Sequence, residues 1–177
     1  MPIIDSTYFY GKISLPQVAD SSGLAVVNKF IALYEPELLL KALGYQLSKD
    51  FVAGIVSPSP DQKWLDLLNG VEYTYGSYPR KWIGFKNAEK RSPIANYVYY
   101  MYQEDAVTTS NMVGVTATQA DNSLRSDPSK KMADAWNEMV YWLLELRQFI
   151  IQNPDPYGRP PYYCWEEVYK TINVLGV

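Results

Sequence analysis

Few residues in this chain could do covalent chemistry, and their neighbours do not favour it. Cys164 is the only cysteine, and the chain contains no histidine. A thiol needs a nearby base or cation to become a thiolate nucleophile, and histidine is the usual base near neutral pH. Cys164 stands between Tyr163 and Trp165. We therefore expect a partly buried, inert thiol.

Two adjacent acidic pairs, Glu104-Asp105 and Glu166-Glu167, are the candidates for acid–base catalysis. Neighbours in sequence point to different sides of an element, so neither pair forms a carboxyl dyad by itself. Two distant carboxylates could still meet in a cleft and hydrolyse a glycoside. A carboxylate-dependent hydrolase is therefore the last alternative, and we predict that the chain is not an enzyme.

Motifs for cofactors and metals are also missing. The ten glycines are scattered singly, and neither a Gly-Lys-Ser/Thr phosphate loop nor an Asp-x-Asp-x-Asp-Gly calcium loop occurs. The sequence therefore predicts no cofactor and no metal ion.

The chain is unusually rich in aromatic residues, with 16 Tyr and 5 Trp. Rings with a polar tip are favoured at protein interfaces, and several on one face could also bind carbohydrate. Segment 80–91 adds basic residues around two rings, a pattern that could contact phosphate. Because the formal charge is −3, we interpret the cluster first as a solvated loop.

Length and composition are typical of one globular domain. The chain has 177 residues, of which 47% are hydrophobic and 20% charged. One cysteine allows no internal disulfide, so nothing indicates an oxidising compartment. No signal-like or membrane-spanning run occurs, so we expect an aqueous, cytoplasmic setting and no membrane partner.

The longest periodic stretch predicts a helix over residues 128–151. Its apolar residues form one stripe at spacings of three and four: Met132, Trp136, Met139, Leu143, Leu146 and Ile150. Asp127 is suited to cap it and Pro128 to begin it. At about 1.5 Å per residue the helix is roughly 36 Å long. Trp142 lies off the stripe, which is typical of a deeply buried or shared helix.

Other helices are expected on either side of Pro36. One runs from Ser21 or Ser22 to about residue 34, and the next restarts at Pro36 and ends or pauses at Gly44. Ser59 and Pro60 are suited to begin a short helix that ends at residues 69–70. Ser92-Pro93 begins another over residues 92–102.

The remaining segments are extended. Alternating residues predict a hairpin at 71–86, and a second small hairpin at 106–118. Residues 1–20 are expected to form an extended N-terminal arm. The favoured alternative is that the arm lies in a groove of its own domain, and the second is that it reaches a neighbouring subunit. Residues 153–161 resemble a polyproline-type spacer, followed by an arm at 162–177 with a short helix at 165–173. The fold class is therefore mainly α: a helical core domain, 21–152, around one long helix with a small hairpin and two arms.

The order of these segments resembles a known group of phage proteins. Residues 29–51, the Lys63–Gly70 helix, Lys81-Trp82-Ile83-Gly84, residues 92–100 and Ala135-Trp136-Asn137-Glu138-Met139 are similar to phage and prophage proteins of Bacteroides-type bacteria. Their helical layout resembles head–tail connector proteins, the adaptor or head-completion subunits under the portal. That resemblance implies a homo-oligomeric ring, commonly twelvefold, in the neck of a virion assembled in the host cytoplasm. The implied partners are the portal protein and a tail or stopper protein.

A ring subunit needs two unlike faces and arms that clasp its neighbours. The basic 80–91 region is expected to face a carboxylate patch on the portal or, in passing, DNA. The predicted interaction residues are Tyr8, Phe9, Tyr10, Arg80, Lys81, Lys86, Arg91, Trp142, Tyr162, Tyr163, Trp165 and Tyr169.

Overall fold

The computed structural model describes residues 2–15, 21–107, 110–111, 114–115, 128–158 and 166–173. The helices are α1 (Ser21–Leu43), α2 (Tyr45–Val56), α3 (Gln62–Asn69), α4 (Pro93–Val107), α5 (Pro128–Gln152) and α6 (Pro154–Tyr157). The 3-10 turns are η1 (Ser6–Tyr8), η2 (Gly11–Ile13) and η4 (Glu166–Tyr169). The strands are β1 (Val71–Tyr75), β2 (Tyr78–Trp82), β3 (Ser110–Asn111) and β4 (Gly114–Val115). The structure is mainly helical with a small antiparallel hairpin, which confirms that part of the predicted fold class.

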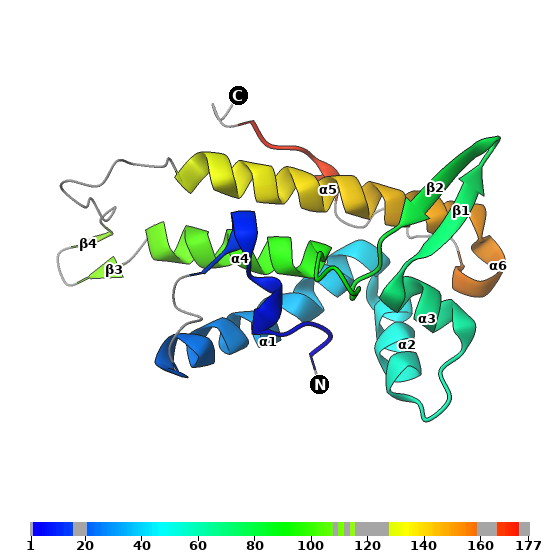
Figure 1. Ribbon diagram of the computed structural model, residues 1–177, viewed down its shortest axis with the longest axis horizontal. Helices are drawn as coiled ribbons and strands as arrows, with labels where there is room; N and C mark the ends of the chain where they lie inside the picture. The colour runs from blue at the N-terminus through cyan, green and yellow to red at the C-terminus, as the bar shows by residue number, and fades with distance from the viewer. Residues whose placement is uncertain are drawn as a thin grey trace.

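Helix α4 lies at the centre of the fold, between α5 on one side and α1 on the other (Figure 1). Its first turns are buried on all sides, with Ile94, Ala95, Tyr97, Val98 and Tyr99 all in the core. A helix with apolar residues all round must be covered by other elements. The prediction of a single long organising helix is not confirmed, because α1 has 23 residues against 25 in α5, and α4 contacts both.

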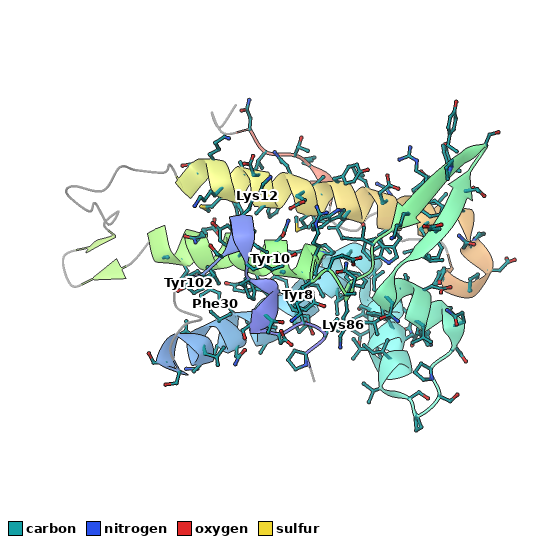
Figure 2. All side chains as sticks on the ribbon, viewed as in Figure 1. Tyr8, Tyr10, Lys12, Phe30, Lys86 and Tyr102 are labelled. Atoms are coloured by element: carbon teal, nitrogen blue, oxygen red, sulfur yellow. The ribbon has the colours of Figure 1, made fainter. Side chains whose placement is uncertain are left out.

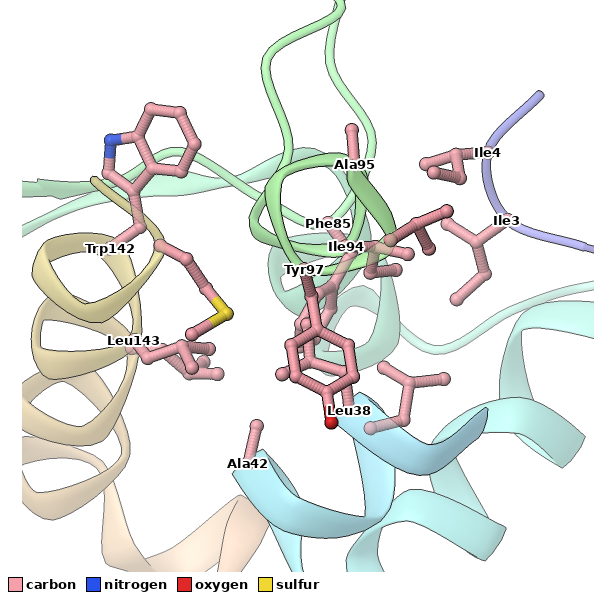
Figure 3. Close-up of a cluster of buried hydrophobic side chains, with 14 of the residues drawn as sticks. Ile3, Ile4, Leu38, Ala42, Phe85, Ile94, Ala95, Tyr97, Trp142 and Leu143 are labelled. Carbon is pink, nitrogen blue, oxygen red and sulfur yellow. The ribbon is translucent and has the colours of Figure 1, made fainter. Parts of the chain in front are cut away.

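The predicted stripe on α5 is buried from Met139 to Ile150. Figure 3 shows how it meets the other helices, with Leu38 of α1, Tyr97 of α4 and Leu143 of α5 close together around one core. The spacing of apolar residues therefore predicted the inner face of this helix correctly.

Helix α1 continues through Pro36, so the predicted break there is wrong. A proline inside a helix removes one hydrogen bond and costs about 3 kcal/mol. Pro36 is exposed, whereas Ile31 and Leu38 on either side are buried. Burial of Ile31 and Leu38 offsets the cost of the proline, because both side chains reach the core only when the helix continues straight through Pro36. The break falls at Gly44, whose φ of 76° is left-handed.

Two further boundaries differ from the prediction. Helix α3 begins at Gln62, with Asp61 as its N-cap and an Asp61 carbonyl that accepts the Trp64 N–H at 2.9 Å. The predicted start at Ser59-Pro60 is therefore wrong. Residues 154–157 form a helical turn because proline is tolerated at the first positions, so the spacer prediction is wrong there. Of the predicted 165–173 helix, only η4 is helical among the described residues.

The two predicted hairpins are present. Strands β1 and β2 pair antiparallel from Val71 opposite Trp82 to Tyr75 opposite Tyr78. Strands β3 and β4 pair over two residues each. The first hairpin packs its β2 strand on α5 and extends beyond it (Figure 1).

The N-terminal segment, residues 2–15, packs on its own domain, as the first of the two alternatives predicted. Its side chains Ile3, Ile4, Phe9 and Leu15 are buried in the core. It crosses α4 and ends in two short turns, η1 and η2 (Figure 1). The segment therefore completes the fold and forms part of its surface.

Candidate interaction surfaces

A groove lined by positive charge runs along one face of the molecule. Its first hollow, of about 550 Å³, lies between η2 and the start of α5 and contains Lys12, Lys130 and Lys131. A second hollow of about 250 Å³ shares Lys12 and adds Lys90 and Arg91. The two hollows therefore lie next to each other.

A third hollow of about 650 Å³ shares Arg91 with the second and adds Lys81 and Lys86. Figure 2 shows Tyr10, Lys12 and Lys86 on the face turned toward the reader. We call these three hollows the basic groove. Its charged residues are seven cations, Lys12, Lys81, Lys86, Lys90, Arg91, Lys130 and Lys131, and three carboxylates, Glu89, Asp134 and Glu138.

Arg91 is the fixed charge of the groove. Its guanidinium lies 2.7 Å from the Glu138 carboxylate and over the Trp142 ring, 5.2 Å from the centroid. Glu138 also accepts the Asn96 amide at 3.1 Å. The six lysines make no ion pair with any described residue, although Lys90 donates to the Thr7 hydroxyl at 2.7 Å. Most of the positive charge in the groove therefore faces solvent.

The loop that carries Lys86, Lys90 and Arg91 is held by its own hydrogen bonds. The Asn87 amide donates to the Arg91 carbonyl at 2.5 Å and accepts the Arg91 N–H at 2.9 Å. Ser92 donates to the Phe85 carbonyl at 2.6 Å and accepts the Ile94 N–H at the start of α4. The cations of this loop therefore project from a closed turn.

Positive charge also acts on Asp5, beside the groove. The Thr7 hydroxyl and N–H donate to its carboxylate and hold the pKa of Asp5 below its ordinary value. The nearby charges of Lys90 and Lys86 lower the pKa further. The hydrogen bonds from Thr7 and the two nearby lysines therefore favour the ionised form of the Asp5 carboxyl.

Three predicted interaction residues, Lys81, Lys86 and Arg91, meet in the groove, but Arg80 does not. Arg80 lies on β2 and pairs with Glu145 of α5 at 2.6 Å. Glu145 is buried and also accepts the Tyr73 hydroxyl at 3.0 Å. Burial, and then this bond, raises the pKa of the Tyr73 phenol. Arg80 therefore fastens the hairpin to α5.

Some of the predicted aromatic interaction residues are buried and others are exposed. Tyr8, Phe9 and Trp142 are buried, so their rings pack inside this chain. Tyr10 is 49% exposed in the groove and donates to the Glu89 carbonyl at 2.6 Å.

The C-terminal aromatic contacts are described only at Tyr169. It is half-buried, and its hydroxyl donates to the Ala42 carbonyl at 3.1 Å. Tyr162, Tyr163 and Trp165 lie outside the described residues.

The sequence analysis did not predict three lysines of the groove, Lys12, Lys130 and Lys131, as interaction residues. They lie in segments more than a hundred residues apart, and neither segment is strongly basic by itself. The only available signal was the Lys130-Lys131 pair at the start of a helix, where negative charge is usually favoured. Only the packing of η2 on α5 joins these lysines to the 81–91 cluster.

A second charged surface, which we call the acidic end, lies over α2, α3 and β1. Its two hollows, of about 600 and 540 Å³, contain the carboxylates Asp50, Asp61, Asp66 and Glu72 and one cation, Lys63. Asp50 and Asp66 accept amide hydrogens from Gln46 and Gln62. None of the four carboxylates forms an ion pair in the described part of the chain.

Large apolar side chains are exposed on several elements, and the two groups of three lie on α2 and α5. Tyr45, Val52 and Val56 form the α2 face, with 70%, 44% and 71% exposure. Tyr141, Leu144 and Ile151 form the α5 face, with 60%, 45% and 46%. Helix α5 lies along one edge of the molecule and α2 near the opposite edge (Figure 1).

The described ranges contain no group of three or more metal-ligating side chains. Within them, no helix combines the length and apolar character that a membrane crossing requires. No family model, curated protein or solved structure matches the chain.

Proposed function

We propose that the chain is a structural subunit of the connector between the head and tail of a tailed phage. Copies associate into a ring, twelvefold as the resemblance implies, in the neck of the virion. The ring docks on the portal protein and receives a tail or stopper protein. Assembly takes place in the host cytoplasm.

The observation that carries this proposal is the pair of unlike apolar faces on α2 and α5. Monomeric proteins rarely expose large contiguous apolar patches, and such patches commonly mark contacts between proteins. Two different patches favour head-to-tail association, in which the α2 face of one copy covers the α5 face of the next. Repetition of that contact closes a ring when the rotation allows it.

The interior of the chain supports a structural role. Among the described residues two carboxylates are buried, Glu35 and Glu145, and they are engaged by backbone N–H groups and by Arg80 respectively. Both join segments that lie far apart in sequence. Their charge is therefore used to hold the fold together.

Variants on the two faces test the ring. We expect Val56→Arg on the α2 face and Leu144→Arg on the α5 face each to stop assembly, because each buries an unpaired charge in the contact. Mixed together they should form a dimer and nothing larger, since each keeps one intact face. Leu33→Arg, at an exposed α1 position outside both faces, is the matched control and should still form rings.

Assembly is measured by light scattering and electron microscopy, with and without portal protein. Rings of wild-type protein stacked on portal rings are expected. A wild-type chain that stays monomeric and ignores the portal contradicts the proposal.

A carbohydrate-binding module is a second candidate because of the hairpin tip. Tyr75 and Tyr78 lie opposite each other in the register and are 45% and 72% exposed. Two rings on one face of a hairpin could stack on a sugar. Titration with glycans should then change tyrosine fluorescence in the wild type but not in Tyr75→Ala/Tyr78→Ala. No change in either protein removes this candidate.

A further inference from the structure

We infer that the basic groove of one subunit receives the acidic end of the next copy. This inference rests on the proposed ring and names the charged contact that sets its register. The charged contact would act together with the contact between the two apolar faces and would fix the orientation of neighbouring subunits.

The charges of the chain are separated between these two surfaces. The groove contains seven of the 16 basic residues but only three of the 19 acidic ones. The acidic end contains four carboxylates and one lysine. Because the chain as a whole has a charge of −3, its net charge alone does not explain a positive groove.

Most charged side chains of both surfaces lack an ion partner within the described part of their own chain. The groove's six lysines and the four carboxylates of the acidic end form no ion pair there. Surfaces of opposite sign guide association and fix register, while like charges brought together oppose it. A second copy supplies both partners at once, and because the two patches differ the contact is head-to-tail.

The groove fits a protein surface better than a nucleic acid strand. Glu89, Asp134 and Glu138 lie among its cations and would repel a continuous phosphate backbone. Strands are commonly bound by several exposed rings, whereas Tyr10 is the one largely exposed ring among the groove's described residues. A protein surface can place neutral groups opposite the three carboxylates.

Apolar groups adjoin both charged surfaces. Tyr10 lies within the groove, and Tyr45 of the α2 face lines the acidic end. Interfaces commonly surround ring contacts with a polar rim. The acidic end therefore adjoins the α2 face, so a neighbour that covers the α2 face also approaches the acidic end.

A charge exchange tests the inference. Lys12→Glu/Lys131→Glu makes the groove less positive, and Asp61→Lys/Asp66→Lys makes the acidic end more positive. Each double variant should weaken self-association at least about tenfold, because like charges then meet. The two doubles combined in one chain should recover most of the loss. Lys29→Glu, an exposed α1 position outside the groove, should change little.

Association is measured by sedimentation velocity, with thermal melting as the check that each variant is folded. The wild-type rings should also weaken from about 0.05 M to about 0.5 M NaCl, since salt screens such contacts. Wild-type rings that are insensitive to salt and to every charge variant overturn the inference and leave the ring standing. A wild type that forms no ring removes the proposed function as well.

One further outcome favours a different ligand. In that outcome a labelled single-stranded oligonucleotide is retained by the wild type and lost by Lys12→Glu/Lys131→Glu, while ring formation is unchanged. The groove would then be a phosphate site, and the inference would be refuted.

Discussion

Glu35 fixes the N-terminal segment to α1, and its removal tests how the groove wall is held. Its carboxylate accepts the Ile3 N–H at 2.8 and 2.9 Å and the Ile4 N–H at 3.1 Å. Glu35, Ile3 and Ile4 are all buried. In Glu35→Ala both backbone N–H groups would therefore lose their partner without access to water.

The cost follows from those two donors. A buried N–H without an acceptor costs about 1–3 kcal/mol, and removing the buried carboxylate regains part of its desolvation. We expect Glu35→Ala to lower the free energy of unfolding by about 3 kcal/mol. For a chain of this size that is a fall in Tm of about 6–12 °C. Asp105→Ala removes an exposed carboxylate on α4 and should cost less than about 0.5 kcal/mol.

The readouts are urea unfolding and limited proteolysis. Trypsin should cut after Lys12 sooner in Glu35→Ala than in the wild type, because the released segment becomes accessible. Ring formation should weaken as well, since Tyr10 and Lys12 belong to the groove. A Glu35→Ala protein with wild-type melting and wild-type resistance to trypsin refutes this reasoning.

The same carboxyl predicts a pH dependence. Burial raises the pKa of Glu35 above its ordinary value of 4.5, and the N–H groups of Ile3 and Ile4 lower it in part. The folded chain then holds this proton more tightly than the unfolded chain does. Relative to Glu35→Gln, the wild type should be most stable below pH 4.5 and lose that advantage as pH rises through the raised pKa. An advantage that grows with pH contradicts the assignment.

Three other substitutions test the fold by urea unfolding. Gly84→Ala should cost at least about 2 kcal/mol, since φ is +87° and the new Cβ would lie 2.4 Å from the Asn69 carbonyl carbon. Gly76→Ala, at φ +60° with open space around it, should cost about 1 kcal/mol, and equal losses would contradict the packing argument. Pro36→Ala should raise the free energy of unfolding by about 2 kcal/mol, because it restores a helical hydrogen bond at an exposed position. A lower free energy of unfolding would mean that the proline is required there. Arg80→Met should cost about 1 kcal/mol, a value discounted for the partial exposure of Arg80. Its exposed neighbour Lys81 has no ion pair among the described residues and should tolerate Met, and similar effects of the two changes would exclude the hairpin anchor.

The N-terminal segment links stability to the proposed contact. It contributes Ile3 and Phe9 to the core and Tyr10 and Lys12 to the groove. The hydrogen bonds to the buried Glu35 carboxylate therefore hold a segment that contributes both to the core and to the proposed contact between subunits. Changes that release the segment should affect assembly before they unfold the helical core.

Local patterns determined much of the fold. The spacing from Met139 to Ile150 predicted the buried face of α5, and the alternation before Gly76 predicted the hairpin. Both are short-range effects, because side-chain direction follows from the period of the helix or strand. The ends of the helices were less predictable. Pro36 indicated a helix end, but the burial of side chains on both sides of it stabilises a continuous helix.

The absence of histidine, the single cysteine and the many rings were also evident from the sequence, and they directed the functional hypothesis toward binding. The two charged surfaces were decided only by the tertiary structure. Lys12 and Lys131 line one hollow because η2 packs on α5, and the neighbouring hollows extend the positive charge to Lys86. Charge acts through distance in space, and distance along the chain says little about it.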